Sequence, residues 1–142
     1  MIGDRGEVRI LVVDDNPTNL KLVSTVLRAD GFDVYTAVDG GSALVALRDY
    51  RPALVFTDVH LPDFDGLELT RMIKADPETA GIVVVALTAS VMAVDESRAL
   101  LAGCDGFIVK PFDTRNLGAT ADRYLGRMDG APGPSGELTA GP

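Results

Sequence analysis

The chain has 142 residues, of which 46% are hydrophobic and 24% charged, which is the balance of one globular domain with a sizeable core. Its formal net charge of -8 argues against a nucleic-acid-binding module, because such modules normally carry a basic patch. The single cysteine excludes an internal disulfide and any metal site built from several cysteines, and it suits a reducing cytoplasm.

The sequence contains neither a secretory signal nor a segment long enough to span a membrane. The opening "MIGDRGEV" is charged and contains no apolar stretch, so it does not resemble a secretory signal. The longest uncharged segment, Gly81–Val94, is too short to cross a bilayer. We therefore expect a cytoplasmic protein without a membrane or nucleic-acid partner.

Five runs of residues predict β-strands. In chain order they are Val8–Val13, Asp33–Ala37, Ala53–Thr57, Ile82–Leu87 and Phe107–Val109. Four of them are continuous apolar stretches rich in β-branched residues, as expected of parallel strands covered on both faces. The second run alternates between apolar and polar residues, which places it nearer an edge of the sheet.

Helical spacing of apolar residues fills the gaps between these runs. The first predicted helix begins at Pro17. The other four cover Gly41–Tyr50, Gly66–Ala75, Val91–Ala102 and Thr114–Met128. Strands that alternate with five helices predict an α/β fold with a five-stranded parallel sheet. We expect the flavodoxin-like, doubly wound strand order 2-1-3-4-5 in a domain that spans residues 1–128. Residues 129–142 are rich in glycine and proline, which predicts a disordered tail.

Acidic residues follow two of the predicted strands. Asp14 and Asp15 come directly after the first strand, and Asp58 comes directly after the third. These strands are neighbours in the expected order, and ligands of such sheets bind at the carboxyl ends of strands, so the three carboxylates should converge. Carboxylates without histidine or cysteine partners form a hard-oxygen site that suits Mg²⁺.

Two further polar residues follow strands at the same edge of the sheet. Thr88 comes after the fourth strand and Lys110 after the fifth. Together with a metal ion, they would form a cradle for a phosphoryl group, whose transfer needs mainly positioning and charge stabilisation. Taken singly, each acid could be a solvated loop residue, and Thr88 could cap the helix that follows it.

Four segments, "VVDDNPTN", "FTDVHLPDFDG", "ALTAS" and "FIVKPF", stand in an order and spacing that resemble a response-regulator receiver domain of two-component signalling. The resemblance covers about residues 8–127, and the opening "DDNPTNLKL" is similar to single-domain regulators of the chemotaxis and cell-cycle type and to receivers attached to hybrid kinases. It implies that Asp58 accepts a phosphoryl group from a phosphohistidine. It also implies that Asp15 and Asp58 bind Mg²⁺ directly, that Asp14 acts largely through water, and that the backbone carbonyl of His60 is a further ligand.

The resemblance assigns expected roles to other residues as well. Thr88 and Phe107 would be the switch pair, and Lys110 would form a salt bridge with the phosphoryl group. Pro62 and Gly66 would shape the loop after the acceptor, and Pro111 would follow a cis peptide bond. The implied partners are a histidine kinase or histidine phosphotransfer protein and a downstream protein target that reads the surface of the fourth helix, fifth strand and fifth helix. The resemblance also leaves room for a homodimer that forms on phosphorylation.

This interpretation makes the chain a switch rather than an enzyme, because its only catalysis is its own phosphorylation and slow Mg²⁺-assisted dephosphorylation. Three alternatives stay open. A haloacid-dehalogenase-type phosphatase would need an Asp-x-Asp pair after the first strand, and an FMN carrier would need a phosphate loop where "DDNPTN" stands. A receiver that serves mainly as a protein-binding scaffold is the third. We expect the His60 side chain to take no part, Cys104 to be a small buried residue, and "DFDG" to form a turn.

Overall fold

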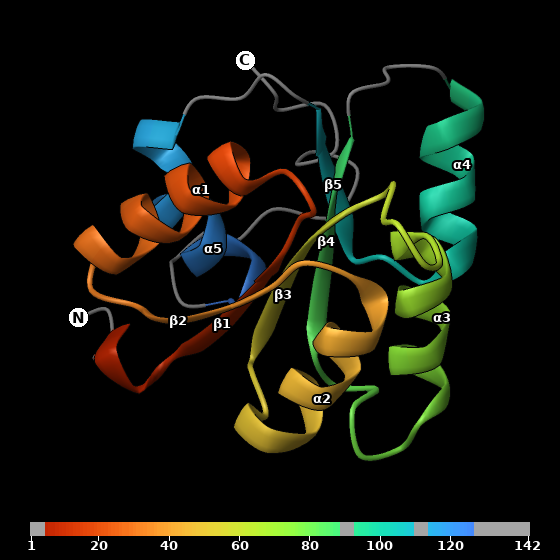
Figure 1. Cartoon of the computed structure of the whole chain (residues 1–142), viewed down its shortest axis with the longest axis horizontal. Helices are drawn as coiled ribbons and strands as arrows, with labels where there is room; N and C mark the ends of the chain where they lie inside the picture. The colour runs from red at the N-terminus through yellow and green to blue at the C-terminus, as the bar shows by residue number, and fades with distance from the viewer. Residues whose placement is uncertain (1–4, 89–92, 110–113, 127–142) are drawn as a thin grey trace.

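The computed structural model of the chain describes residues 5–88, 93–109 and 114–126, with backbone only at 93–97 and 114 (Figure 1). The strands are β1 (Arg9–Val13), β2 (Asp33–Ala37), β3 (Leu54–Asp58), β4 (Val83–Thr88) and β5 (Gly106–Val109). The α-helices are α1 (Pro17–Ala29), α2 (Gly40–Tyr50), α3 (Gly66–Ala75), α4 (Ala93–Ala102) and α5 (Leu117–Tyr124). Short 3₁₀ helices precede β1 (Arg5–Glu7) and α5 (Thr114–Asn116).

The five strands form one parallel sheet in the order β2-β1-β3-β4-β5, which confirms the predicted fold class and strand order. The alternating second run is an edge strand, as predicted. Val13, the last residue of β1, lies opposite Ala37 on one side and Thr57 on the other. The carboxyl ends of β2, β1 and β3 are therefore level, and the loops that follow them meet at one edge of the sheet.

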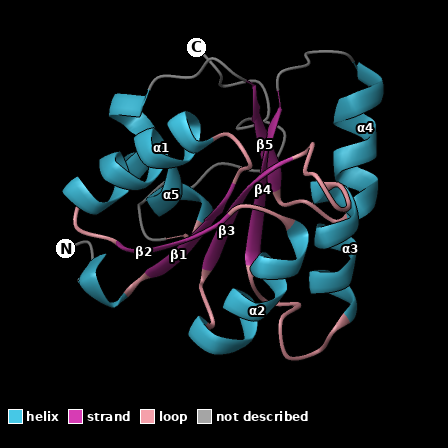
Figure 2. Cartoon of the chain, in the orientation of Figure 1, coloured by secondary structure: helices cyan, strands magenta, loops and turns pink. Residues whose placement is uncertain are grey.

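Helices cover both faces of the sheet (Figure 2). Helices α1 and α5 lie on one side, and α2, α3 and α4 lie on the other. Successive side chains of a strand point to opposite faces of the sheet. Ile10 and Val12 pack with α1 and α5, and Leu11 and Val13 pack with α2, α3 and α4. Burial on both faces explains why these strands read as continuous apolar runs.

Acidic and amide side chains begin three of the helices at this same edge of the sheet. Asn16 accepts hydrogen bonds from the first turn of α1, Asp39 from the Ser42 backbone N–H of α2 at 2.7 Å, and Asp65 from the Glu68 backbone N–H of α3 at 2.8 Å. Caps of this kind each stabilise a helix by roughly 0.5–2 kcal/mol, because they satisfy donors that have no partner within the helix. The loops that lead from strand to helix are thus defined by local hydrogen bonds.

The last helix is shorter than the sequence predicted. A single helix was expected over Thr114–Met128, but the structure has a 3₁₀ helix at Thr114–Asn116 and an α-helix over Leu117–Tyr124. Gly126 has a φ of 70°, the left-handed conformation that commonly ends a helix. The apolar spacing predicted the buried face correctly and overestimated the length, because spacing carries no information on where the backbone reverses its hand.

Two other expectations concern the limits of the chain. None of the helices in the described ranges is long and apolar enough to cross a membrane. The predicted tail, residues 129–142, lies outside the described residues, so the division between domain and tail stays a prediction.

Candidate metal centre

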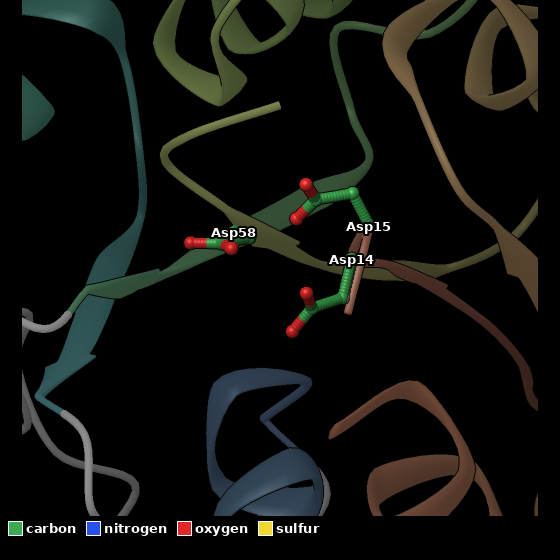
Figure 3. Close-up of side chains that lie close together, drawn as sticks. All are labelled: Asp14, Asp15 and Asp58. Carbon is green, nitrogen blue, oxygen red and sulfur yellow. The ribbon is translucent and has the colours of Figure 1, made fainter. Parts of the chain in front are cut away.

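Three carboxylates meet at the carboxyl edge of the sheet. Asp14 and Asp15 follow β1, and Asp58 is the last residue of the neighbouring strand β3. One oxygen from each of them lies within 4.8 Å of the others. Figure 3 shows the side chains projecting from the ends of the two adjacent strands. The level register of these strands, and not any local motif, creates the cluster.

The three acids differ in their surroundings. Asp14 is only 1% exposed, Asp58 is half-buried and Asp15 is exposed. The backbone N–H of Asp14 donates to the carbonyl of Ala37 at 3.1 Å, and its carboxylate accepts from the Asn16 backbone N–H at 2.9 Å. Asp14 is therefore held at a fixed place between the β1–α1 loop and the end of β2.

Electrostatics make this cluster a candidate cation site. Two carboxylates 4.8 Å apart repel each other by roughly 3 kcal/mol at an effective dielectric constant of about 20, and three acids form three such pairs. A divalent cation among them would offset this repulsion. The donor atoms are all carboxylate oxygens, the hard ligands that Mg²⁺ prefers, and the cluster contains none of the sulfur or imidazole ligands that favour softer metals.

The loop after Asp58, residues 59–65, folds back over the strand ends. The Val59 N–H donates to the carbonyl of Leu87 in β4 at 3.2 Å, and the Gly66 N–H donates to the carbonyl of Val59 at 2.6 Å. The His60 N–H points at the Asp58 carboxylate, with 3.4 Å between nitrogen and oxygen. The side chains of His60 and Pro62 are exposed, so the loop meets the acceptor through its backbone.

Gly66 stands where this loop enters α3. A Cβ atom at Gly66 would lie far inside van der Waals distance of the Asp58 carbonyl oxygen and would press on the Thr57 hydroxyl. The helix can therefore approach the end of β3 this closely only with glycine at this position. The resemblance implied that Gly66 shapes this loop, and the structure adds the close approach of α3 to β3 as the physical reason for glycine.

Sequence reasoning did not foresee the contacts of Asp63. Its carboxylate accepts hydrogen bonds from the backbone N–H groups of Gly40 at 2.8 Å, Gly41 at 2.9 Å and Phe64 at 2.8 Å. The hydrogen bond from Gly40, with those from Gly41 and Phe64, lowers the pKa of Asp63 below its ordinary value. Residues 62–64 form a bend, Asp65 caps α3, and Asp63 joins the loop to the first turn of α2, 23 residues away in the chain.

Thr88 and Phe107, the expected switch pair, lie on adjacent strands. Thr88 ends β4 and is 5% exposed, and Phe107 in β5 lies opposite Ala86 and is packed in the core with α2, α3 and α4. Asp58 is opposite Leu87, so Thr88 is one step beyond the acceptor along the neighbouring strand. Both side chains are buried in this structure, and their role as a switch stays a prediction.

Two expected site residues cannot be placed. Lys110 and Pro111 lie outside the described residues, as does the predicted cis bond between them. Cys104 is buried as expected; its burial raises the pKa of the thiol.

Comparisons with known proteins agree with this geometry. Residues 10–122 match the family model of the response regulator receiver domain. The chain is 40% identical over 124 residues to the DNA-binding response regulator MtrA of Mycolicibacterium smegmatis, covering 87% of this chain and 53% of that protein. It is 37% identical over 117 residues to the polar-differentiation response regulator DivK of Brucella anthropi, covering 82% of this chain and 95% of that protein. The chain thus spans about half the length of the MtrA relatives and nearly all of DivK.

Solved structures show the same fold. A response regulator from Chloroflexus aurantiacus superposes with a TM-score of 0.80 at 29% identity, covering 84% of this chain and 98% of that one. The chemotaxis response regulator CheY4 of Vibrio cholerae superposes with a TM-score of 0.78 at 27% identity, covering 82% of this chain and 98% of that one.

Proposed function

The chain belongs to the response regulator receiver domain family of two-component signalling, and from this premise we propose that it is a phosphorylation-controlled switch with Asp58 as the phosphoryl acceptor. One observation carries the proposal. Asp58 ends β3 beside two other carboxylates, with one oxygen of each within 4.8 Å of the rest, at the edge of the sheet where parallel α/β folds bind ligands.

The acidic cluster fits Mg²⁺, and we propose that Asp15 and Asp58 hold the ion directly. Asp14 acts through water, and the backbone carbonyl of His60 is a further ligand. A magnesium ion bound there supplies charge neutralisation for the phosphoryl oxygens. The burial of Asp14 and its hydrogen bond from Asn16 favour this division, because they keep one carboxylate at a fixed place behind the two more exposed ones.

Phosphoryl transfer requires the protein mainly to position the reacting groups and to stabilise charge. A carboxylate oxygen of Asp58 attacks the phosphorus atom of a phosphohistidine on a kinase or phosphotransfer protein. The O–P bond forms as the N–P bond breaks, and the electron pair returns to the imidazole nitrogen, which takes up a proton. Thr88 donates its hydroxyl hydrogen to one phosphoryl oxygen, and Lys110 pairs with another. Attack of water on the phosphorus atom later returns Asp58 to its free carboxylate.

The output of the switch is a change of surface. The hydrogen bond from the Thr88 hydroxyl to the phosphoryl group moves the Thr88 side chain toward Asp58. Phe107 then turns into the space that Thr88 leaves, and this changes the face formed by α4, β5 and α5. Leu100 and Leu101 on α4 are 44% and 84% exposed, and this apolar surface supports a protein partner at that face. A downstream protein or a second copy of the chain binds there.

The proposed activity is self-directed, so the chain is a switch and not an enzyme that turns over a separate substrate. DNA binding is stated in the name of MtrA, whose length is about twice the region matched here. For this chain we propose protein contact instead, because a net charge of -8 opposes association with a polyanion.

Intact-mass measurement tests the proposal directly. The protein is incubated with Mg²⁺ and acetyl phosphate, beside an Asp58→Asn control and a sample with a chelator. We expect a gain of one phosphoryl group in the wild type only, abolished by the chelator. No gain in the wild type, or an equal gain in Asp58→Asn, would reject Asp58 as acceptor and leave the scaffold interpretation.

A further inference from the structure

The loop of residues 59–65 is anchored to α2 as well as to the strands. Asp63 accepts hydrogen bonds from Gly40 and Gly41, the first two residues of α2, with one carboxylate oxygen for each. The ring of Phe64 lies so close to Gly40 that a Cβ atom there would overlap it. A charged contact and a packed ring therefore hold the same loop against the same helix end.

The hydrogen bonds of Asp63 add a second connection between the segments that carry Asp14 and Asp58. The Asp14 N–H donates to the carbonyl of Ala37, which ends β2 and leads through a short turn into α2. Asp63 then ties the start of α2 to the loop that begins at Asp58. The segments that carry Asp14 and Asp58 are thus connected at both ends, once through the β1–β3 pairing and once through Asp63. The hydrogen bonds at Gly40 and Gly41 thus oppose movement of the loop of residues 59–65 away from the start of α2.

We propose that Asp63 is a positioning residue of the metal centre: its carboxylate holds the loop of residues 59–65 against the start of α2 and keeps the backbone of His60 in place beside Asp58. The inference rests on the proposed function, because it treats the His60 carbonyl as a magnesium ligand. Asp63 itself touches neither metal nor phosphoryl group. It acts through the loop, as outer partners of metal ligands do when they fix the orientation of those ligands.

A different role for Asp63 is to cap α2. That task already belongs to Asp39, whose carboxylate accepts from the Ser42 N–H at 2.7 Å and from the Ser42 hydroxyl at 2.7 Å. Asp39 lies at the same helix end as Asp63, and its carboxylate bonds to Ser42 of α2 rather than to the loop of residues 59–65. Replacing either acid by alanine removes one negative charge at the start of α2, so the Asp39→Ala variant is a control for both helix capping and charge.

The experiment measures Mg²⁺ binding to the unphosphorylated full chain by isothermal titration calorimetry. We expect Asp63→Ala to weaken Mg²⁺ binding about 10-fold, the lower end of the range for loss of an outer partner. Asp63→Asn should weaken it less, because its single amide oxygen can still accept from Gly40 and Phe64. The Asp39→Ala control should bind Mg²⁺ with an affinity within about 2-fold of the wild type, since Asp39 does not hold the loop of residues 59–65 and salt screens its charge. The amide protons of Gly40 and Gly41 should exchange faster in Asp63→Ala than in the wild type.

Several results would overturn the inference. Equal affinity of Asp63→Ala and wild type would show that the loop needs no anchor, and an equal loss in Asp39→Ala would assign the effect to helix stability or charge. If Asp63→Ala does not fold, as judged by circular dichroism, an undiminished affinity of Asp63→Asn would refute the graded role of the carboxylate. Absence of Mg²⁺ binding to the wild type would instead defeat the proposed function, which separates the two failures.

Discussion

Adding one methyl group at Gly66 should destabilise the domain and damage the site together. Gly66 is the first residue of α3, where helix propensity by itself favours alanine by up to about 1 kcal/mol. The added Cβ would, however, overlap the backbone carbonyl oxygen of Asp58, which is part of a strand and cannot rotate away as a side chain would. Overpacking of this kind costs about 1–3 kcal/mol, so the sign of the propensity effect should be reversed.

Gly81 provides a control for the substitution at Gly66. A Cβ atom at Gly81, in the loop before β4, would meet no atom within 4 Å. Gly81→Ala should therefore leave the free energy of unfolding unchanged or raise it by about 0.4–1 kcal/mol, because alanine restricts the unfolded chain. Gly66→Ala should lower it by about 1–3 kcal/mol and should also slow phosphorylation by acetyl phosphate, since relief of the overlap moves Asp58.

Urea denaturation followed by far-ultraviolet circular dichroism measures both free energies; the chain has no tryptophan for fluorescence. The two variants should unfold with the same m value as the wild type. If Gly66→Ala proves as stable as Gly81→Ala and is phosphorylated at the wild-type rate, the close approach of α3 to β3 is not a constraint, and the argument for glycine at this position fails.

Three further predictions concern stability. Asp122 is fully buried and forms an ion pair with Arg5, whose guanidinium also donates to the carbonyl of Asp30 at 3.0 Å. Because Arg5→Ala removes the partner of a buried charge, it should lower the free energy of unfolding by about 3–5 kcal/mol in urea denaturation. A loss below about 1 kcal/mol would contradict the reasoning. Hydrogen bonds lower the pKa of Asp63 in the folded state, so its ionised carboxylate should stabilise the fold above the unfolded pKa, near 4. This stabilisation should be lost as pH falls through the lower folded pKa. The difference in the free energy of unfolding between the wild type and Asp63→Asn should therefore be constant at neutral pH and shrink below about pH 4. Mg²⁺ at 100 times its dissociation constant should stabilise the wild type by about 2.7 kcal/mol, with a smaller gain in Asp58→Asn, and an equal gain in both proteins would place the ion elsewhere.

Much of the fold could be predicted because its signals are local. Strands buried on both faces require continuous apolar residues, and helices that cover them require apolar residues at a spacing of three and four, so β1 to β5 and the five helices appear in the sequence with bounds accurate to a few residues. The acidic cluster followed from one further rule. Parallel strands end at one edge, so residues that directly follow β1 and β3 must meet once those strands are neighbours.

The sequence alone therefore determined the sheet, the helices and the meeting of Asp14, Asp15 and Asp58. The tertiary structure decided the rest, because the remaining contacts join residues that no local pattern connects. Asp63 binds Gly40 at a separation of 23 residues, and Arg5 pairs with Asp122 at a separation of 117. Each of these acids looks like an ordinary surface residue in the sequence. Its partner is a backbone group or side chain brought near only by the packing of helices on the sheet. That packing joins Asp63 to the start of α2 and places Asp122 in a buried ion pair.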